Sequence, residues 1–278
     1  MVKKIGYQGE AGANSHIACN IYDNSSSPIA LKTFDEVFIS LEKKEIDLAM
    51  IPIENTIAGR VSDIHRLMPT SNVNIIGETF LKINHCLMSL KESSLKDIKT
   101  VRSHEMALSQ CRNSILNLGL EPVVSADTAG SAKHISKLGD ISKAALASEL
   151  AGKIYGLSVL AKDIEDHDNN TTRFLIMSKT PIADALTNTK MMTSFVFRVK
   201  NIPAALFKAM GGFATNGVNM TKLESYMVDG DFTATQFYAE IEGHPNDKFV
   251  SLAFEELSYF TSKITILGSF PADSRRDL

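Results

Sequence analysis

Tryptophan is absent from the 278-residue sequence, and cysteine occurs only three times. The cysteines, Cys19, Cys86 and Cys111, are spaced too widely for paired zinc ligands and match no disulfide framework. Each lies among apolar or helical neighbours, where a buried reduced thiol is the usual state. The seven histidines include no HxxxH or HxH pair. We therefore expect structural cysteines and no metal site.

The sequence also lacks long apolar runs and a strong charge of either sign. No run approaches the roughly 20 residues that a membrane span requires, and residues 1–5 lead into a strand-like segment without the features of an export signal. The 29 basic and 32 acidic residues leave a formal net charge of −3, which gives no field for gripping a phosphate backbone. We expect a cytoplasmic protein that acts on a small molecule, with no membrane or nucleic-acid partner.

What the sequence contains is a regular alternation of strand-like and helix-like segments, over a length that at roughly 150 residues per domain predicts two domains. Residues 34–44 have the apolar face of an amphipathic helix, and residues 48–53 form the continuous apolar run of a strand covered on both faces. The alternation predicts an α/β fold with a mainly parallel sheet, split into two lobes. Further strands are expected at 4–7, 29–33, 83–88, 100–102, 122–125 and 173–177, and further helices at 15–22, 106–118 and 130–138.

Residues 178–190 lack periodicity and are typical of a linker. We divide the chain into a first domain over 1–180, a linker over 181–192 and a second domain over 193–278. In the second domain, Gly217 is expected to supply the left-handed residue that ends the first helix. The expected order is strand 193–199, helix 204–215, strands 221–228 and 233–241, helix 247–259 and strand 263–267, which is the βαββαβ arrangement of ferredoxin-like folds.

Two segments of the first domain place polar groups after a strand. Residues 6–15 form a glycine-rich turn, neither GxGxxG nor a P-loop. That turn either aims backbone N–H groups at an anion near a helix start or is a plain connection with Ser15 as the helix cap. Residues 52–60 place Asn55 at the carboxyl end of the apolar strand, where ligands bind in open α/β sheets. The alternative for that segment is a simple turn.

A third segment, residues 101–111, is expected to begin a helix. Ser103 is expected to cap this helix, and Gln110, seven positions later, lies on roughly the same face. Both side chains could then hydrogen-bond one substrate, although an ordinary capped amphipathic helix has the same pattern. His104 invites a Ser-His-acid triad, but no GxSxG elbow supports one.

A fourth segment, residues 166–177, leads a polar stretch directly into a buried strand. Thr172 supplies a hydroxyl donor, and Arg173 beside it is a forked cation suited to a carboxylate. The alternative is a turn and a strand whose arginine pairs with a nearby aspartate.

Taken together and in this order, these segments resemble prephenate dehydratases. The matching strings are Gly6-Tyr7-Gln8-Gly9, Pro52-Ile53-Glu54-Asn55-Thr56, Ser103-His104, Asn170-Thr171-Thr172-Arg173-Phe174 and Glu224-Ser225. The resemblance implies a catalytic part of two α/β lobes, like a type II periplasmic binding protein, with the active site between the lobes. It also implies a C-terminal ACT regulatory domain and a homodimer or homotetramer that uses no metal or cofactor.

The reaction of that family removes the ring carboxylate of prephenate as CO₂ and its ring hydroxyl as water, giving phenylpyruvate for L-phenylalanine biosynthesis. The resemblance implies that Thr172 donates a hydrogen bond or proton to the leaving hydroxyl, and that Asn55, Ser103 and Gln110 complete the catalytic group. Arg173 is expected to bind a substrate carboxylate. The other expected substrate-binding residues are Thr56, Glu54, Gly9 and Phe174.

The resemblance further implies a phenylalanine site at an ACT dimer interface, and hence feedback by phenylalanine as a hypothesis. The sequence departs from the usual ACT strings, with Pro203-Ala204-Ala205-Leu206-Phe207 after the first strand and Glu224-Ser225-Tyr226-Met227 in place of Glu-Ser-Arg-Pro. The expected effector-binding residues are Ala205, Leu206, Asn216, Gly217, Val218, Asn219, Glu224 and Ser225.

Two other functions fit the same residues. An arogenate dehydratase performs the same elimination on the aminated substrate, and no residue obviously separates the two. A non-catalytic sensor of an aromatic acid would join a binding-protein-like clamp to an ACT module, and it would bind its ligand without forming phenylpyruvate.

Overall fold

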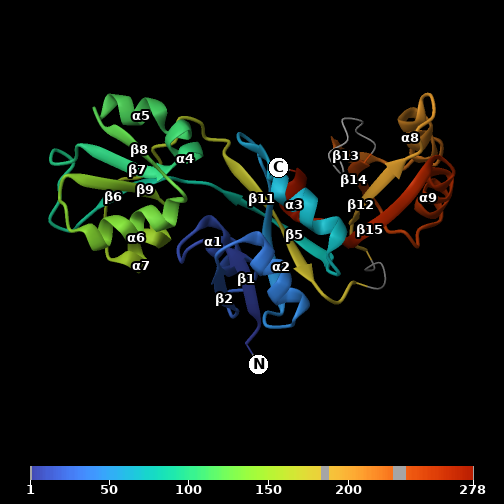
Figure 1. The fold of residues 1–278 in the computed structure, drawn as a ribbon, viewed down its shortest axis with the longest axis horizontal. Coiled ribbons are helices and arrows are strands. Elements are labelled where there is room, and N and C mark those ends of the chain that lie inside the picture. Colours follow the sequence, from blue (N-terminus) through green and yellow to red (C-terminus); the bar gives the residue numbers. More distant parts are fainter. Residues whose placement is uncertain (1, 183–187, 228–235, 278) are drawn as a thin grey trace. The chain divides into compact units, whose positions relative to one another are not determined.

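The computed structural model describes residues 2–182, 188–227 and 236–277. The fold is mixed α/β (Figure 1). By its internal contacts, the chain divides into two compact units. Unit 1 consists of Met1–Val61 and Thr79–Phe174, and unit 2 of Ser62–Glu78 and Leu175–Leu278. The units therefore do not follow the division along the chain that the sequence suggested, because Ser62–Glu78 packs with the C-terminal part. The expected linker, 181–192, falls partly on 183–187, which lie outside the described residues.

The first sheet has the strand order β2-β1-β3-β11-β5, with the short β4 paired to β3. Strands β1 and β2 are parallel, as are β1 and β3. Helix α2 begins where Thr33 accepts a hydrogen bond from the Glu36 amide, a side-chain N-cap. The elements are β1 (Lys4–Gln8), α1 (Asn14–Tyr22), β2 (Ser27–Leu31), α2 (Phe34–Glu42), β3 (Leu48–Asn55), β4 (Gly59–Arg60), α3 (Ser62–Leu67), a 3₁₀ turn (Met68–Thr70), β5 (Asn74–Lys82) and β11 (Thr171–Ser178).

The second sheet has the order β10-β6-β9-β7-β8. Strand β7 is parallel to β8 and β9, whereas β6 is antiparallel to both β9 and β10. The expectation of a mainly parallel sheet therefore holds only in part for this half, since β6 runs against the other four strands and makes both of its pairings antiparallel. The elements are β6 (Cys86–Ser89), β7 (Thr100–His104), α4 (Glu105–Gln110), α5 (Arg112–Asn117), β8 (Glu121–Ser125), α6 (Thr128–Leu138), β9 (Lys143–Ala147), α7 (Glu149–Tyr155) and β10 (Ser158–Ala161).

Several elements were not expected from the sequence. Strand β9 reads Lys-Ala-Ala-Leu-Ala, a composition that favours helix, but its last four residues are fully buried in the sheet. The single helix expected over 106–118 is two short helices that break at Cys111.

Cys19, Cys86 and Cys111 are all buried and form no disulfide. Burial raises the pKa of the Cys19 thiol to about 12.

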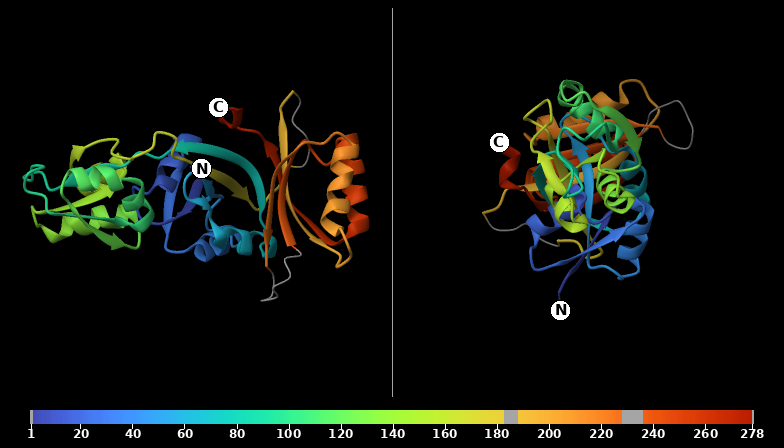
Figure 2. Two further views of the ribbon diagram at one scale, coloured as in Figure 1. Left: turned by 90° about the horizontal axis from the view of Figure 1, so that it is seen from above. Right: turned by 90° about the vertical axis from the view of Figure 1, so that its left-hand side faces the viewer.

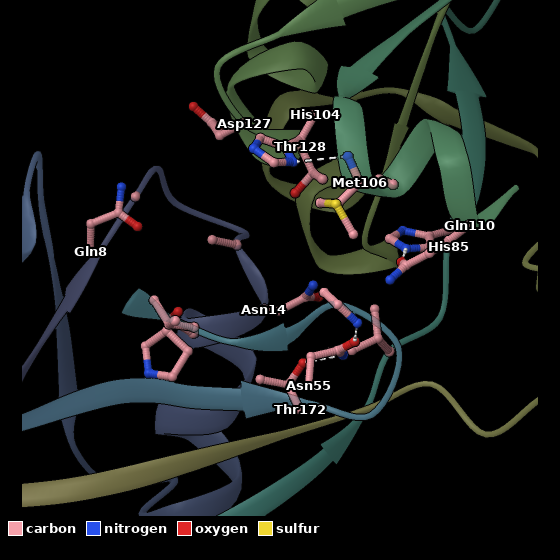
Figure 3. A pocket seen from close by; sticks show the side chains of 18 of the residues that line it. Gln8, Asn14, Asn55, His85, His104, Met106, Gln110, Asp127, Thr128 and Thr172 are labelled. Atoms are coloured by element: carbon pink, nitrogen blue, oxygen red, sulfur yellow. Dashed lines mark hydrogen bonds between the residues drawn. The ribbon is translucent and has the colours of Figure 1, made fainter. Parts of the chain in front are cut away.

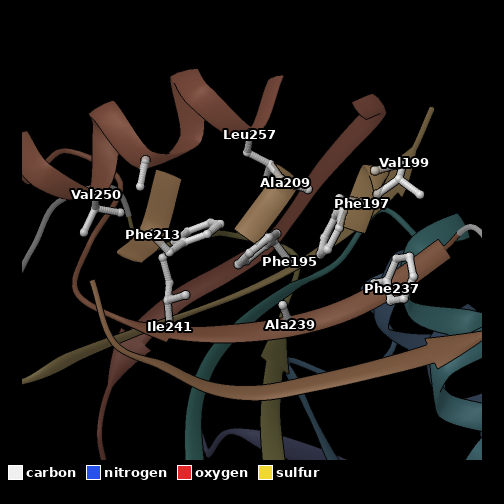
Figure 4. Close-up of a cluster of buried hydrophobic side chains, with 12 residues drawn as sticks. Phe195, Phe197, Val199, Ala209, Phe213, Phe237, Ala239, Ile241, Val250 and Leu257 are labelled. Carbon is white, nitrogen blue, oxygen red and sulfur yellow. The ribbon is translucent and has the colours of Figure 1, made fainter. Parts of the chain in front are cut away.

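Unit 2 contains the expected βαββαβ order. Its sheet order is β13-β14-β12-β15, with antiparallel neighbours. Helices α8 and α9 lie together on one side of this sheet (Figure 2), and phenylalanines fill the space beneath them (Figure 4). Gly217 has a φ of +66° just after α8, as predicted. The elements are β12 (Met191–Val199), α8 (Ala205–Thr215), β13 (Met220–Tyr226), β14 (Gln236–Glu242), α9 (Lys248–Phe260), β15 (Thr261–Pro271) and a 3₁₀ turn (Ser274–Asp277). The expected strand ends at 228 and 233–235 lie outside the described residues.

Ser62–Glu78 joins unit 2 through specific contacts. His65 of α3 is buried, stacks edge-on against Tyr238 at 5.0 Å between ring centroids, and lies 3.3 Å from a carboxylate oxygen of Glu224. Glu78, at the end of this segment, forms a two-point ion pair with Arg276. Throughout the described part of the chain, no helix is both long and apolar enough to cross a bilayer.

Candidate active site

A cavity of about 410 Å³ lies in unit 1, lined by residues that follow strands or begin helices (Figure 3). Gln8 ends β1, Asn55 ends β3 and His104 ends β7, so the carboxyl ends of three strands meet here, as in other open α/β sheets. The cavity also receives the first residues of α1 and α6. The start of α1 has no side-chain cap, and backbone N–H groups at such a helix start favour anions. Its polar lining residues are Gln8, Asn14, Ser15, Asn55, His85, His104, Gln110, Asp127, Thr128 and Thr172.

The side chain of Asn55 is fixed by its own turn. Its Oδ1 accepts hydrogen bonds from the backbone N–H groups of Ile57 at 2.9 Å and Ala58 at 2.8 Å. Two backbone donors leave no doubt about which end of the amide is oxygen. The Nδ2 group therefore faces the other way, where it lies 2.8 Å from Asn170 Oδ1 and 2.9 Å from Thr172 Oγ1.

Thr172 is on β11 with its hydroxyl in the cavity beside Asn55 (Figure 3). Because Asn55 Nδ2 is a donor only, Thr172 Oγ1 accepts in this bond and its hydrogen is directed elsewhere. The predicted association of Thr172 with Asn55 across 117 residues of sequence is present in the structure. The pair presents one oriented hydroxyl donor to whatever occupies the cavity.

Gln110 ends α4 and is largely buried at the cavity wall. Its Oε1 lies 2.9 Å from Asn170 Nδ2 and 3.0 Å from His85 Nε2. Burial lowers the pKa of His85, against a smaller raising effect of the bond to Gln110, so this imidazole is neutral near pH 7. Gln110, Asn55 and Thr172 are therefore joined into one hydrogen-bonded group through Asn170.

Ser103 does not occupy the expected position. It lies in β7 rather than at the start of a helix, is fully buried, and donates its hydroxyl to the carbonyl of Leu146 at 2.6 Å. The helix cap is His104, whose Nδ1 accepts from the Met106 amide at 3.2 Å. The expectation that Ser103 and Gln110 share a helix face is wrong because the strand runs two residues further than its sequence pattern indicates.

Arg173 also lies away from the cavity. Side chains alternate along a strand, so Thr172 and Phe174 face the cavity whereas Arg173 faces the opposite side. There its Nη1 lies 3.0 Å from Glu54 Oε1, and the guanidinium is buried. The alternative of a structurally paired arginine, with glutamate in place of aspartate, is therefore the observed one.

The remaining predicted substrate contacts divide in the same way. Gly9 and Phe174 line the cavity. Glu54 and Thr56 line a separate space of about 180 Å³ on the far side of the sheet. Thr56 donates its hydroxyl to the carbonyl of Asn169 at 2.6 Å and accepts from the Thr171 amide at 2.9 Å, so it ties β11 to the turn after β3.

The charge of the cavity is low. Among its described lining residues there is no lysine or arginine, and Asp127 is the one carboxylate. Asp127 caps α6 by accepting from the Gly130 amide, so much of its charge faces a helix start. An anion in this cavity would be held by backbone N–H groups, amides and hydroxyls rather than by an ion pair.

Contacts beside the cavity join the two sheets of unit 1. Ser148, the cap of α7, donates its hydroxyl to the carbonyl of Gly12 at 2.5 Å. Lys133 of α6 forms an ion pair with Glu10 at 2.8 Å. The glycine-rich turn therefore connects the two sheets as well as lining the cavity. This second role was not predicted from its sequence.

Sequence reasoning missed several polar residues at the site. His85 follows Asn84 just before the apolar residues 86–88, and Asn170 belongs to a matching string in which no role was predicted for it. The other missed residues are Gln8, Asn14, His104 and Thr128.

The predicted effector residues lie in unit 2 and are not gathered at one point. Val218 lines a second cavity of about 360 Å³ with residues of α8 and β13. Asn216 hydrogen-bonds its own helix at the Gly212 carbonyl and Glu256 of α9, and Glu224 pairs with Lys222 at 3.2 Å. Ala205 and Leu206 begin α8, Gly217 and Asn219 belong to the turn after it, and Ser225 is on the exposed side of β13.

Comparison with known proteins identifies relatives over nearly the whole chain. A family model described as prephenate dehydratase matches residues 5–182. The sequence is 42% identical over 272 residues to a bifunctional N-acyl-homoserine lactone acylase/prephenate dehydratase of Komagataeibacter europaeus, covering 98% of this chain and 97% of that protein. It is 36% identical over 280 residues to arogenate dehydratase/prephenate dehydratase 2 of Arabidopsis thaliana, covering 98% of this chain and 73% of that protein.

Solved structures agree with these relatives. One, described as a novel type of quorum quenching acylase, has a TM-score of 0.93 at 42% identity and covers 99% of this chain and 100% of that chain. Another, a prephenate dehydratase from Arthrobacter aurescens in complex with L-Phe, has a TM-score of 0.89 at 26% identity and covers 98% of this chain and 91% of that chain.

Proposed function

This chain belongs to the prephenate dehydratase family, and from that premise we propose that it converts prephenate to phenylpyruvate. The reaction breaks the bond from the ring to its carboxylate and the bond from the ring to its hydroxyl. CO₂ leaves, the electron pair it releases completes the aromatic ring, and the hydroxyl departs as water once it has received one proton. The observation that carries the proposal is the oriented hydroxyl of Thr172 inside the cavity.

Thr172 assists the departure of the hydroxyl. Because Asn55 occupies a lone pair of Thr172 Oγ1, the threonine hydrogen is available to the leaving oxygen. Threonine is a weak acid, so the proton moves as the C–O bond breaks, and water restores the hydroxyl. Assistance of this kind typically accelerates a reaction by about 10²–10⁴-fold.

The cavity wall suits the carboxylate that leaves. Ile83, Ala107 and Phe174 give it an apolar side, where a carboxylate is poorly solvated and fragments more readily. Gln110 and Asn14 offer amide N–H groups, and the start of α1 offers backbone N–H groups, to the charges that stay. In this proposal neither substrate carboxylate is bound by Arg173, since that guanidinium is paired with Glu54 on the other side of the sheet.

The test is to incubate the purified protein with prephenate and to follow phenylpyruvate by its absorbance in alkali. Thr172→Ala should lower kcat by about 10²-fold or more with a small change in KM, since it removes a contact made to the leaving group. Thr172→Ser should retain most of the activity. Thr171→Val, one residue away and absent from the cavity lining, is the matched control. Near-normal turnover by Thr172→Ala would remove this residue from the mechanism.

The same assay separates the alternatives. An arogenate dehydratase would show the higher kcat/KM with arogenate, and a sensor would bind prephenate without forming phenylpyruvate. The acylase activity named for the 42% identical relative is measured alongside. We favour dehydration because the cavity gives Thr172 an amide neighbour rather than a general base.

We also propose feedback by phenylalanine through unit 2, acting as an ACT domain in a homodimer or homotetramer. The support is the βαββαβ order and the 26% identical dehydratase whose structure contains L-Phe. The second cavity offers apolar side chains for a phenyl ring, and its lining includes Lys222, which is paired with Glu224. Titrating the activity with phenylalanine tests this, and an unchanged rate at saturating effector would contradict it.

A further inference from the structure

Two buried residues, His85 in the cavity wall and Asn170 behind it, have no role in the mechanism above. Asn170 is fully buried, and His85 is 3% exposed. Both are hydrogen-bonded to Gln110, and Asn170 is also bonded to Asn55. Buried polar groups of this kind are costly unless each donor meets an acceptor, so their orientations are determined by one another.

The orientations follow from one fixed point. Backbone N–H groups of Ile57 and Ala58 require the Asn55 oxygen, so Asn55 Nδ2 is the donor toward Asn170. Asn170 must therefore accept this hydrogen bond with Oδ1, and its Nδ2 then points to Gln110. A reversed Asn170 would place two amide nitrogens 2.8 Å apart, with a hydrogen on each pointing at the other.

The same logic reaches the histidine. Gln110 must meet the Asn170 donor with Oε1, and His85 Nε2 lies 3.0 Å from that same oxygen. Two acceptor atoms would repel each other at this distance, so His85 Nε2 carries a hydrogen and donates it to Gln110 Oε1. The Oε1 atom of Gln110 thus faces Asn170 and His85, and the side-chain N–H₂ group of Gln110, its one side-chain donor, faces the cavity.

We propose that His85 and Asn170 are positioning residues that hold the Gln110 amide with its N–H₂ group toward the substrate, as part of one relay that also directs the Thr172 hydroxyl. This inference deepens the proposed dehydratase function and rests on it. Asn170 links the Gln110 amide to the Thr172 hydroxyl. Its Nδ2 donates to Gln110, and its Oδ1 accepts from Asn55, which in turn donates to Thr172. His85 closes the relay at its far end.

The charged groups around the relay do not compete for these bonds. Glu165 accepts from the backbone N–H of His85, and the backbone N–H of Asp166 donates to the Gln110 carbonyl. Arg173 and Glu54 pair on the opposite face of β11. Burial lowers the pKa of His85, and both its neutral Nε2–H form and its charged form donate from Nε2.

Asn170→Asp gives the sharpest test, because its carboxyl group is a hydrogen-bond donor to Gln110 when protonated and only an acceptor when ionised. When protonated, its O–H donates to Gln110 Oε1 as the native amide does. When ionised, it only accepts, so Gln110 turns its N–H₂ group inward and presents oxygen to the substrate. We expect kcat, relative to wild type at the same pH, to fall at least tenfold as pH rises through the pKa of the new carboxyl, which burial raises.

Asn169→Asp is the matched control, because it adds the same charge one residue away at an exposed position. Its ratio to wild type should stay flat with pH. A flat ratio for Asn170→Asp as well would overturn the relay. A structural defect alone lowers activity at every pH and gives no recovery on acidification.

Two His85 variants keep the test informative if Asn170→Asp fails to fold. His85→Gln retains a donor and should keep kcat within about threefold, whereas His85→Met should lose tenfold or more with little change in KM. Equal kcat in the two variants would overturn the role of His85.

A readout without substrate separates this inference from the proposed function. Nitrogen NMR of the wild-type protein should show His85 protonated at Nε2 and not at Nδ1 at neutral pH. A proton on Nδ1 alone would overturn the relay even in an active enzyme. If neither prephenate nor arogenate is consumed by the wild type, the proposed function fails, while this spectrum still decides the orientation.

Discussion

At the scale of single residues, the Arg173–Glu54 pair is the clearest departure from expectation. The guanidinium is buried, while Glu54 keeps about a third of its side chain exposed, at 34%. Solvent reaches one partner only, so the pair is intermediate between a surface and a buried ion pair.

Arg173→Met should therefore lower the free energy of unfolding by about 1–3 kcal/mol, because it removes the buried half of the ion pair with Glu54. KM for prephenate should stay within about threefold of wild type, because Arg173 does not line the cavity. Urea unfolding and steady-state kinetics measure the two quantities. Lys133→Met, which breaks the more exposed pair with Glu10, is the control and should destabilise the protein less than Arg173→Met does. A 10²-fold rise in KM for Arg173→Met at unchanged stability would restore it as a substrate ligand.

Part of the site could be predicted from the sequence, and part of it could not. Strand alternation around Thr172 already implied that Arg173 faces away, and the motif order placed Thr172, Asn55 and Gln110 in one region. The hydrogen bond from Asn55 to Asn170 spans 115 positions, and no periodicity encodes it. The structure was needed to show that Asn170 and His85 connect residues that the motifs had named separately.

At the scale of elements, the turn between β1 and α1 depends on Gly12. Its φ is +89°, and an added Cβ would lie 2.6 Å from the Cα of Ala151 in α7. Backbone at that distance cannot move aside cheaply, so the contact between the two sheets of unit 1 requires glycine here.

Gly12→Ala should lower the free energy of unfolding by about 2 kcal/mol or more, since it combines a strained φ with a backbone clash. Thermal unfolding measures the loss as a lower melting temperature. It should also reduce kcat/KM, because Gly9 and Ala13 on either side line the cavity. Gly119→Ala is the control, with a φ of +64° and nothing within 4 Å of the added methyl group. Equal losses in the two variants would show that φ alone matters and that the close approach to α7 does not.

Elements with strong periodicity were predicted well, and those set by distant partners were not. The helix at Phe34–Glu42 and both helices of the βαββαβ unit have apolar faces that the sequence displays. Strand β9 and strand β5 depend on sheet neighbours instead. The alanines of β9 form a strand because β7 and β6 pair with them, which overrides their helix propensity.

At the scale of the whole molecule, unit 2 is held together by its last described residues. Arg276 pairs with Glu78 at 2.7 Å and Glu240 at 3.3 Å, and the side chains of both carboxylates are essentially fully buried. Tyr238 and Ser194 add hydroxyl groups around Glu240. One arginine therefore pairs with two carboxylates from segments far apart in the sequence.

Arg276→Met should lower the free energy of unfolding by about 3 kcal/mol or more, because it removes a cation that pairs with two buried carboxylates. Arg275→Met is the neighbouring control: its side chain is 36% exposed and pairs with Asp273, so it should cost less than about 1 kcal/mol. Chemical denaturation of both variants measures the difference. Similar losses in the two would mean that Glu78 and Glu240 find other partners.

The path of the chain has a practical consequence for dissecting this protein. Residue pairs 61–62, 78–79 and 174–175 each pass from one unit to the other, and Val61 and Phe174 both line the cavity. A genetic cut in the segment that resembled a linker would leave Ser62–Glu78 on the wrong fragment, with His65 and Glu78 stripped of their neighbours. Neither half should then be obtained as a well-behaved product by itself, and recovering a soluble complex would require expressing the two halves together.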